Sequence, residues 1–148
     1  MRNQNTNILV IGSGLAGAVA ALSAAEENKQ VVLLTNCPEP LSGNTPWAQG
    51  GIAYTNTQDS PEKFKDDILK AGNHNNYKLA VDQLVNEGPK LVEKLLLQKL
   101  NIPFETDKKN KLIFTAEAAH TINRIIHCKD ETGYNIHFNI LKAVQAHP

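Results

Sequence analysis

A glycine-rich turn near the start of the chain constrains the fold more than any other feature. An apolar run over residues 7–11 ends at Gly12-Ser13-Gly14. An alanine-rich stretch without proline follows over 15–26, and a second apolar run occupies 31–35. Apolar runs that end at glycine are typical of buried strands, and alanine favours a helix. The order strand, helix, strand predicts a βαβ unit with parallel strands and a right-handed crossover, and therefore an α/β fold.

The composition excludes several classes of protein. The chain has 148 residues, 15 Lys plus Arg against 15 Asp plus Glu, 41% hydrophobic and 20% charged residues. These values are ordinary for a globular protein and predict one domain, not a disordered or collagen-like chain. A net charge of zero argues against a general nucleic-acid binder. No apolar run reaches the roughly 20 residues of a membrane span, and the polar start, Met1–Asn7, does not resemble a secretory signal.

The two cysteines, Cys37 and Cys128, are far apart in the sequence. They provide neither a disulfide framework nor the spacing of metal ligands, so no metal site is predicted. We interpret them as reduced thiols, which is typical of a cytoplasmic protein.

The middle of the chain predicts one irregular segment and then helices. Residues 36–56 have no sustained period, and their apolar content favours an ordered loop. Asp59-Ser60-Pro61-Glu62 predicts a helix start, and Gly72 its end. We expect a second helix over 76–87 with Leu79, Leu84 and Val85 inward. A third should restart at Gly88-Pro89, with an apolar face of Leu91, Val92, Leu95, Leu96 and Leu100.

The last third predicts a hairpin and a helix. Residues 102–106 and 111–115 flank a polar turn, and 132–145 carries Ile136, Ile140 and Val144 at helical spacing. The sequence stops at Pro148, where a parallel α/β fold would supply its next strand, and two parallel strands cannot bury both faces of a sheet. We therefore expect a fragment of a longer fold.

The spacing Gly12-x-Gly14-x-x-Gly17 has a chemical explanation. The first glycine permits a sharp turn, the second lets the backbone approach a pyrophosphate, and the third lets the helix pack closely on the strand. The helix N-terminus then offers free N–H groups to phosphates. The alternative is a glycine turn that serves packing alone. Asn36 stands where nicotinamide dehydrogenases commonly carry a ribose-binding acid, so FAD is favoured over NAD.

A second candidate site occupies residues 44–51, Asn-Thr-Pro-Trp-Ala-Gln-Gly-Gly. Paired glycines allow the backbone close to a flat ring, and Thr45 and Gln49 can offer polar contacts to its edge. A surface loop with a buried Trp47 explains the same residues equally well.

Three segments together carry a resemblance to a known family. Residues 7–17, the run Trp47-Ala-Gln-Gly-Gly-Ile-Ala53 and residues 117–133 resemble the N-terminal part of the L-aspartate oxidases. These enzymes belong to the flavoprotein family of succinate dehydrogenase and fumarate reductase. The resemblance covers essentially the whole chain, and the Ala-Gln-Gly-Gly segment is its most specific part. It implies the N-terminal portion of a Rossmann-like FAD-binding domain over 1–148, without the family's capping and C-terminal helical domains.

The resemblance also implies site residues. Those assigned to FAD are Gly12, Ser13, Gly14, Leu15, Ala16, Gly17, Asn36, Asn44, Thr45, Pro46, Trp47, Ala48, Gln49, Gly50 and Gly51. Asn36 replaces a lysine that is common in the family. Asn44 replaces the histidine that binds flavin covalently in respiratory succinate dehydrogenases, so the resemblance implies non-covalent FAD.

Glu117 matches the family glutamate that orients the amino-acid substrate. A carboxylate beside the ammonium of aspartate would distinguish it from succinate. The family normally has two glycines after this glutamate and two adjacent arginines later, where this chain has Ala118-Ala119 and Asn123-Arg124. Without the resemblance, Glu117 and His120 would be interpreted as solvated loop residues. No catalytic residue is assigned within the chain, and His137 receives no functional role.

The implied reaction is oxidation of L-aspartate to iminoaspartate, with hydride transfer to FAD and reoxidation by O2 or fumarate. It serves quinolinate and NAD synthesis, with quinolinate synthase as an expected partner. The family's carboxylate-binding arginine and histidines lie beyond residue 148, so we expect no turnover by this chain alone. The alternatives are a fumarate reductase or succinate dehydrogenase flavoprotein segment, an inactive remnant, or a module completed by a partner chain.

Overall fold

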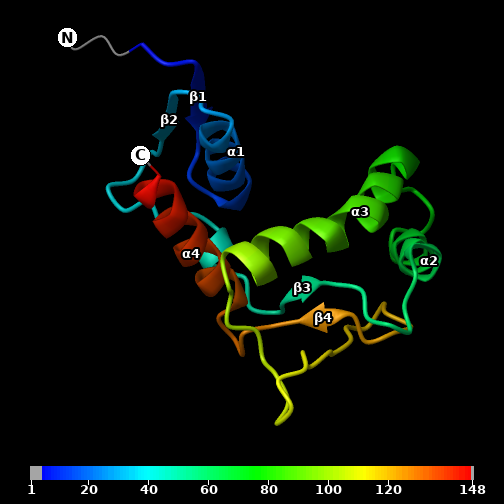
Figure 1. The fold of residues 1–148 in the computed structure, drawn as a ribbon. Helices are drawn as coiled ribbons and strands as arrows, with labels where there is room; N and C mark the ends of the chain where they lie inside the picture. Colours follow the sequence, from blue (N-terminus) through cyan, green and yellow to red (C-terminus); the bar gives the residue numbers. More distant parts are fainter. Residues whose placement is uncertain (1–4, 148) are drawn as a thin grey trace. The chain divides into compact units, whose positions relative to one another are not determined.

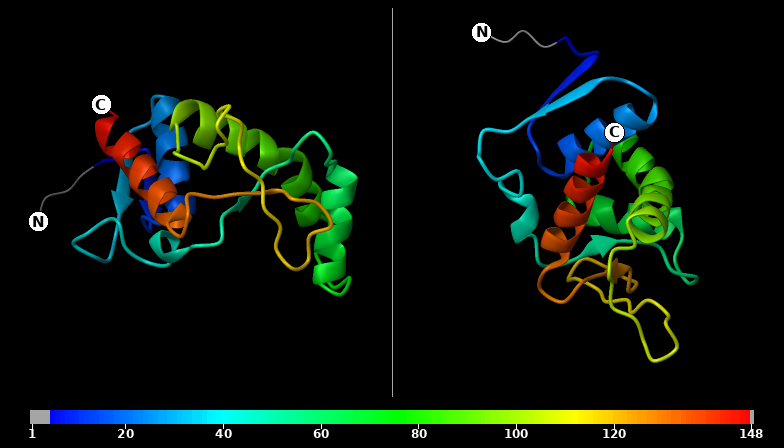
Figure 2. Two further views of the ribbon diagram at one scale, coloured as in Figure 1. Left: turned by 90° about the horizontal axis from the view of Figure 1, so that it is seen from below. Right: turned by 60° about the vertical axis from the view of Figure 1, so that its left-hand side comes forward.

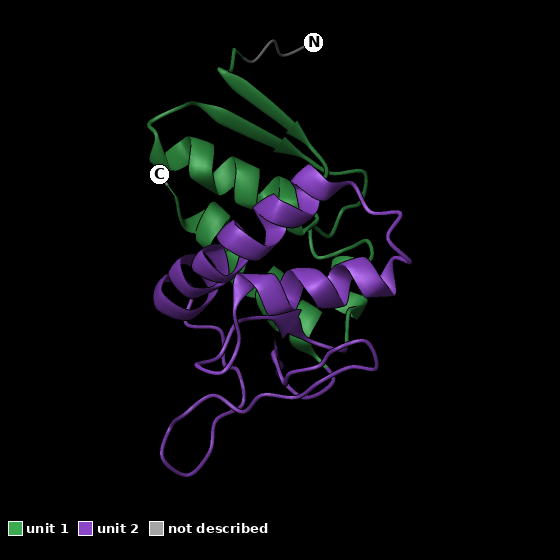
Figure 3. Cartoon of the chain, turned by 90° about the vertical axis from the view of Figure 1, so that its right-hand side faces the viewer, with its two compact units in different colours: residues 1–49, 131–148 green, residues 50–130 purple. Residues whose placement is uncertain are grey.

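The computed structural model describes residues 5–147, so Met1–Gln4 of the polar start and the terminal Pro148 lie outside the described residues. The chain divides into two compact units (Figure 3). The first contains the residues up to Gln49 together with those from Glu131 onward, and the second contains Gly50–Asp130. Each unit is described by itself.

The first unit opens with the predicted βαβ arrangement. Strand β1 (Ile8–Ile11), helix α1 (Leu15–Glu26) and strand β2 (Val31–Leu34) follow in order. The strands pair in parallel, with Ile11 opposite Leu34 at their carboxyl ends. The prediction of parallel strands joined by a helix is therefore confirmed. The parallel pairing places the turn after β1 beside the end of β2.

Helix α4 (Thr132–Ala146) completes the first unit and confirms the predicted C-terminal helix. It packs against α1 and against a short 3-10 helix, η1 (Thr45–Trp47); Figures 1 and 2 show α4 beside α1. Small residues on α1 allow this close packing. The buried apolar residues are Ala18, Ala21 and Leu22 from α1 and Ile136, Ile140 and Leu141 from α4. Burial of these side chains is the main stabilising contribution in this unit.

The second unit combines a small antiparallel sheet with helices. Strand β3 (Ile52–Ala53) pairs with β4 (Ile125–Ile126). Helix α2 (Pro61–Ala71) begins where predicted, because the Ser60 hydroxyl accepts a hydrogen bond from the Lys63 N–H. It packs against the next helix around a core of Phe64, Val81 and Val85.

The expected break at Gly88-Pro89 is wrong. Helix α3 (Lys78–Leu91) runs through both residues and continues as a π-helix, η2 (Val92–Lys99). Buried residues at helical spacing continue past the proline, and this packing outweighs the lost backbone hydrogen bond. These buried residues are Val81, Val85, Val92 and Leu96. The inward orientation predicted for some leucines is also wrong: Leu79, Leu84 and Leu91 are exposed, so the buried face is narrower than expected.

The predicted hairpin forms, but its two arms pair through a single bridge. Thr106 and Leu112 make an isolated antiparallel bridge, and the Asp107 carboxylate accepts hydrogen bonds from the N–H groups of Lys109 and Lys111. Nearby, Cys128 is a buried thiol whose pKa is raised to about 11 by burial and by the negative charge of Glu105. Among residues 5–147, no helix is both long and apolar enough to cross a membrane.

Candidate functional site

The glycine turn, residues 12–17, connects the end of β1 to the start of α1. Gly12 has a φ of +109°, and its N–H donates a 2.7 Å hydrogen bond to the Leu34 carbonyl of β2. A methyl group on Gly17 would collide with the Gly12 carbonyl. The main chain of the turn therefore lies so close to α1 that only glycine fits at position 17. Gly14 is the N-cap of α1, and no side chain of its own caps the helix.

Ser13 is held on three sides within this turn. Its hydroxyl donates a 2.7 Å hydrogen bond to the Pro40 carbonyl and lies 3.2 Å from the Thr35 hydroxyl. Its carbonyl oxygen lies 2.6 Å from Nε2 of His137 on α4. Ser13 is buried, so the group that it can offer to a cofactor is the main chain rather than the hydroxyl.

The segment Asn44–Gln49 lies against the glycine turn within the first unit. The Leu15 N–H, at the start of α1, donates a 3.2 Å hydrogen bond to the Thr45 hydroxyl. From the other side, the Gly133 N–H of α4 donates to the Ala48 carbonyl at 2.8 Å. Two predicted cofactor segments, about thirty residues apart in the sequence, therefore meet at one end of one helix.

Trp47 does not pack into the interior. Its exposed fraction is 80%, so the alternative of a surface loop that buries this ring is wrong. Asn36 is also exposed, two residues past the end of β2 and thus at the carboxyl edge of the parallel strands. In open α/β sheets, ligands bind at this edge.

The groups at this edge suit the diphosphate of FAD. The start of α1 carries main-chain N–H groups and the positive end of the helix dipole, and Gly14 carries no side chain over them. Asn44 is the N-cap of η1, and an amide side chain cannot form the covalent bond that histidine makes with flavin. The residues present therefore fit a non-covalently bound dinucleotide.

The second unit carries the remaining predicted site residues, Gly50, Gly51 and Glu117. Glu117 lies on the loop between residues 115 and 125, here called the Glu117 loop. Glu117 is exposed. A methyl group on Gly50 would lie only 2.7 Å from the Glu117 carboxylate oxygen Oε1. Glycine at position 50 thus leaves the room that this carboxylate occupies. The contact joins two residues that the resemblance assigns to different ligands, the flavin and the amino acid.

Backbone pairing closes the base of the Glu117 loop. Thr115 and Ile125 exchange two main-chain hydrogen bonds, each of 2.9 Å. Inside the loop, the His120 N–H donates to the Glu117 carbonyl at 2.9 Å. The Asn56 side chain donates to the Asn123 carbonyl and connects the loop to the segment after β3.

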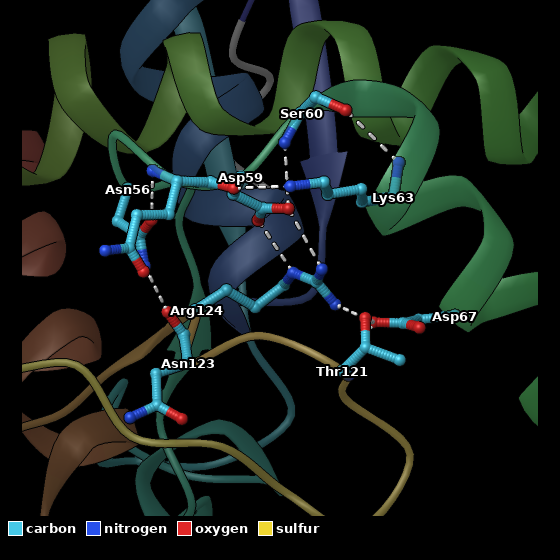
Figure 4. Close-up of polar contacts among 9 residues, drawn as sticks. Asn56, Asp59, Ser60, Lys63, Asp67, Thr121, Asn123 and Arg124 are labelled. Carbon is cyan, nitrogen blue, oxygen red and sulfur yellow. Dashed lines mark hydrogen bonds and ion pairs between the residues drawn. The ribbon is translucent and has the colours of Figure 1, made fainter.

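A buried group of charges anchors the far side of this loop (Figure 4). Nε and a terminal nitrogen of Arg124 donate to the two carboxylate oxygens of Asp59 at 2.8 and 3.0 Å. The other terminal nitrogen donates to Asp67 at 2.6 Å. The same Asp67 oxygen accepts hydrogen bonds from the N–H and hydroxyl of Thr121. We call these four residues the Arg124 cluster.

The three charged side chains of the Arg124 cluster are shielded from water. The exposed fractions of the Arg124, Asp59 and Asp67 side chains are 0%, 0% and 2%. Phe64 covers the guanidinium, with its ring centroid 4.7 Å from Cζ. Burial would raise the pKa of Asp67, but hydrogen bonds from Thr121 and Arg124 outweigh it and lower that pKa. The hydrogen bonds that Arg124 donates to Asp59 and then to Asp67 raise the pKa of Arg124 against the effect of burial.

Sequence reasoning missed the roles of Asp67 and His137, although both carry a positional signal. Asp67 lies three residues after Phe64 on the buried face of α2, and His137 lies between Ile136 and Ile140 on α4. A polar side chain on an apolar helix face needs a buried partner. The role of Asp59, which precedes the helix and is interpreted from the sequence only as part of a helix start, was also missed.

The chain is similar in sequence to known proteins. A family model described as the FAD binding domain matches residues 7–148. The chain belongs to this FAD-binding family. An L-aspartate oxidase of Halobacterium salinarum is 42% identical over 96% of the chain, and one of Clostridium acetobutylicum is 36% identical over 99%. The resemblance drawn from the motifs is thereby confirmed, and FAD is the cofactor that it indicates. The chain spans 27% and 33% of these relatives' lengths.

Solved structures of flavoproteins share the fold. Mycobacterium smegmatis Sdh1 matches 97% of the chain with a TM-score of 0.87 and 26% identity, over 24% of its own length. E. coli quinol fumarate reductase matches the whole chain with a TM-score of 0.88 at 22% identity, over 25% of its own length. The predicted α/β class is confirmed by these matches.

Proposed function

We propose that this chain supplies the cofactor-binding part of an FAD-dependent L-aspartate oxidase. The observation that supports the proposal is the hydrogen bond from the Leu15 N–H to the Thr45 hydroxyl, which joins both predicted FAD segments of the first unit. The reaction is oxidation of L-aspartate to iminoaspartate, and bound FAD supplies the hydride acceptor. O2 or fumarate is the proposed final acceptor, and the product feeds quinolinate and NAD synthesis.

The chain's own residues bind the cofactor and orient the substrate in this proposal. The amides of Gly14 and Ala16 receive the diphosphate at the positive end of α1, while the Leu15 N–H holds Thr45. Glu117 accepts hydrogen bonds from the substrate ammonium. Gly50 leaves room for that carboxylate. Carboxylate recognition and proton removal fall to groups outside this chain, so the chain alone does not turn over aspartate.

Asn44 and Glu117 favour this function over the alternative of a fumarate reductase or succinate dehydrogenase flavoprotein. The first excludes a histidyl bond to flavin, and the second suits an ammonium-bearing substrate. The matching solved structures share the fold of the chain, and a shared fold does not distinguish the two enzymes. We further propose a cytoplasmic location and quinolinate synthase as the partner that consumes the product.

The direct test is a titration of the purified chain with FAD, followed by flavin absorbance and by co-elution in gel filtration. We expect saturable binding of one FAD, released on denaturation. Gly17→Ala should weaken binding at least about tenfold, because the methyl group displaces the turn. Gly88→Ala is the matched control: its methyl group would meet only Leu84, at 4.0 Å, and it should bind FAD as the wild type does.

Activity is tested separately. Aspartate-dependent peroxide release by the FAD-loaded chain should stay at background. Turnover above background would contradict the assignment of the proton-transferring groups to regions outside the chain. Failure of the wild type to bind FAD would contradict the proposed function itself.

A further inference from the structure

His137 is a buried histidine on α4 that the proposed reaction does not use. Its exposed fraction is 0%, and Nε2 lies 2.6 Å from the Ser13 carbonyl oxygen. A carbonyl only accepts, so Nε2 carries the proton and donates it to Ser13. The other ring nitrogen, Nδ1, is buried without a hydrogen-bond partner within residues 5–147.

An unpartnered buried nitrogen costs free energy that an apolar residue at this position would avoid. The neighbouring buried residues of α4, Ile136 and Ile140, are apolar. Histidine at position 137 is therefore explained by its other nitrogen, which reaches the cofactor-binding turn. The bond joins two positions 124 residues apart.

The contact fixes more than the Ser13 carbonyl. The peptide bond between Ser13 and Gly14 is planar and trans, so the Ser13 C=O and the Gly14 N–H point in opposite directions within one plane. A donor that holds the carbonyl toward α4 turns the Gly14 N–H away from α4. Gly14 is the N-cap of α1, the position at which free N–H groups receive phosphate.

A second hydrogen bond restrains Ser13, but it acts on the side chain and not on the carbonyl group. The hydrogen bond from its hydroxyl to the Pro40 carbonyl fixes the side chain. Rotation of the following peptide plane is not restrained by that bond, because the plane rotates about the bond between Cα and C. His137 restrains this rotation.

We propose that His137 is a positioning residue of the FAD site, which orients the Gly14 N–H toward the cofactor diphosphate by holding the Ser13 carbonyl. The inference rests on the proposed cofactor role of the glycine turn. It assigns no proton transfer to His137, which acts through the main chain of the turn.

The first test needs no cofactor. In the ¹⁵N-labelled chain, the chemical shifts and the N–H residual dipolar coupling of Gly14 report the orientation of the peptide plane. His137→Leu keeps the volume and removes the donor, and we expect a clear change in both values. His137→Gln should restore both values, since its amide nitrogen is as many bonds from Cβ as Nε2. The amide nitrogen of His137→Asn is one bond closer to Cβ, so this variant should behave like His137→Leu.

Ile140→Val is the matched control, because it loosens α4 packing without removing a donor. It should leave the chemical shifts and the dipolar coupling of Gly14 close to those of the wild type. Should His137→Leu not fold, the difference between His137→Gln and His137→Asn decides the question. An unchanged dipolar coupling of Gly14 in both His137→Leu and His137→Asn, or an equal effect in Ile140→Val, would overturn the proposal.

The second test uses ligands. FAD and ADP share the adenosine diphosphate moiety, so His137→Leu should weaken both by about tenfold, with His137→Gln close to the wild type. Loss of affinity for FAD alone would point to the flavin ring and contradict the proposal. If the wild type binds neither ligand, the proposed function fails, while the Gly14 amide measurements still decide the role of His137.

Discussion

The glycine turn of the first unit and the Glu117 loop of the second are held in place by different kinds of interaction. Hydrogen bonds hold the turn, and they involve the Leu34 carbonyl, the Thr45 hydroxyl and the His137 ring. Buried charges hold the loop, with one guanidinium between two carboxylates. We therefore expect the turn to be sensitive to added volume and lost donors, and the loop to be sensitive to any change of charge.

The largest effect should come from Arg124→Met. The substitution leaves two buried carboxylates without a counter-charge, and it should lower the free energy of unfolding by about 3–5 kcal/mol. Urea denaturation measures this value. Lys65→Met, which breaks the half-exposed ion pair with Asp82, is the control and should cost less than about 1 kcal/mol. Equal losses in the two variants would remove the distinction between the loop and an ordinary surface pair.

The pH dependence of stability sharpens the same contrast. Hydrogen bonds lower the folded-state pKa of Asp67 below its value in the unfolded chain, despite the opposing effect of burial. The resulting stabilisation is fully present above the unfolded pKa and is lost as pH falls through the folded pKa. Between pH 5 and pH 2 the wild type should thus lose stability more steeply than Asp67→Asn, by up to about 1.4 kcal/mol per pH unit. Parallel pH profiles from urea denaturation would contradict this role of Asp67.

On the side of the turn, Thr45→Val removes the oxygen that accepts from the Leu15 N–H and preserves the shape of the side chain. We expect a loss of about 1 kcal/mol in the free energy of unfolding and weaker FAD binding. Thr57→Val, at an exposed position of the second unit, should change neither value measurably.

The smallest effect on stability should come from Gly50→Ala. The added methyl group meets the far end of the flexible Glu117 side chain, which can rotate away for less than about 1 kcal/mol. The ¹³C chemical shift of the Glu117 carboxyl group should nevertheless change, because the carboxylate leaves its position. An unchanged shift would show that Gly50 does not determine where Glu117 lies.

The fold was predictable where neighbouring residues decide it. The strand, turn and helix of residues 8–26 follow from an apolar run, three glycines and an alanine-rich stretch, and the structure has them within a residue of the expected bounds. At Gly88-Pro89 the local signal for a break is overridden by the buried residues on either side.

The site was predictable only in part. The resemblance supplied the FAD and Glu117 assignments, but the interactions that hold them join distant positions. Asp59 and Asp67 precede Arg124 by 65 and 57 residues, and His137 follows Ser13 by 124. No periodicity encodes such pairs, although a polar residue on an apolar helix face indicates that a partner exists.

The two thiols described above differ enough to be addressed separately by alkylating reagents. With its pKa near 11, the buried Cys128 is a thiolate in only about one molecule in a thousand at pH 8. Cys37 is half-buried and lies directly after Asn36, beside the carboxyl edge of the parallel strands. A maleimide fluorophore should thus attach at Cys37 alone, and its emission would report nucleotide occupancy without any engineered substitution.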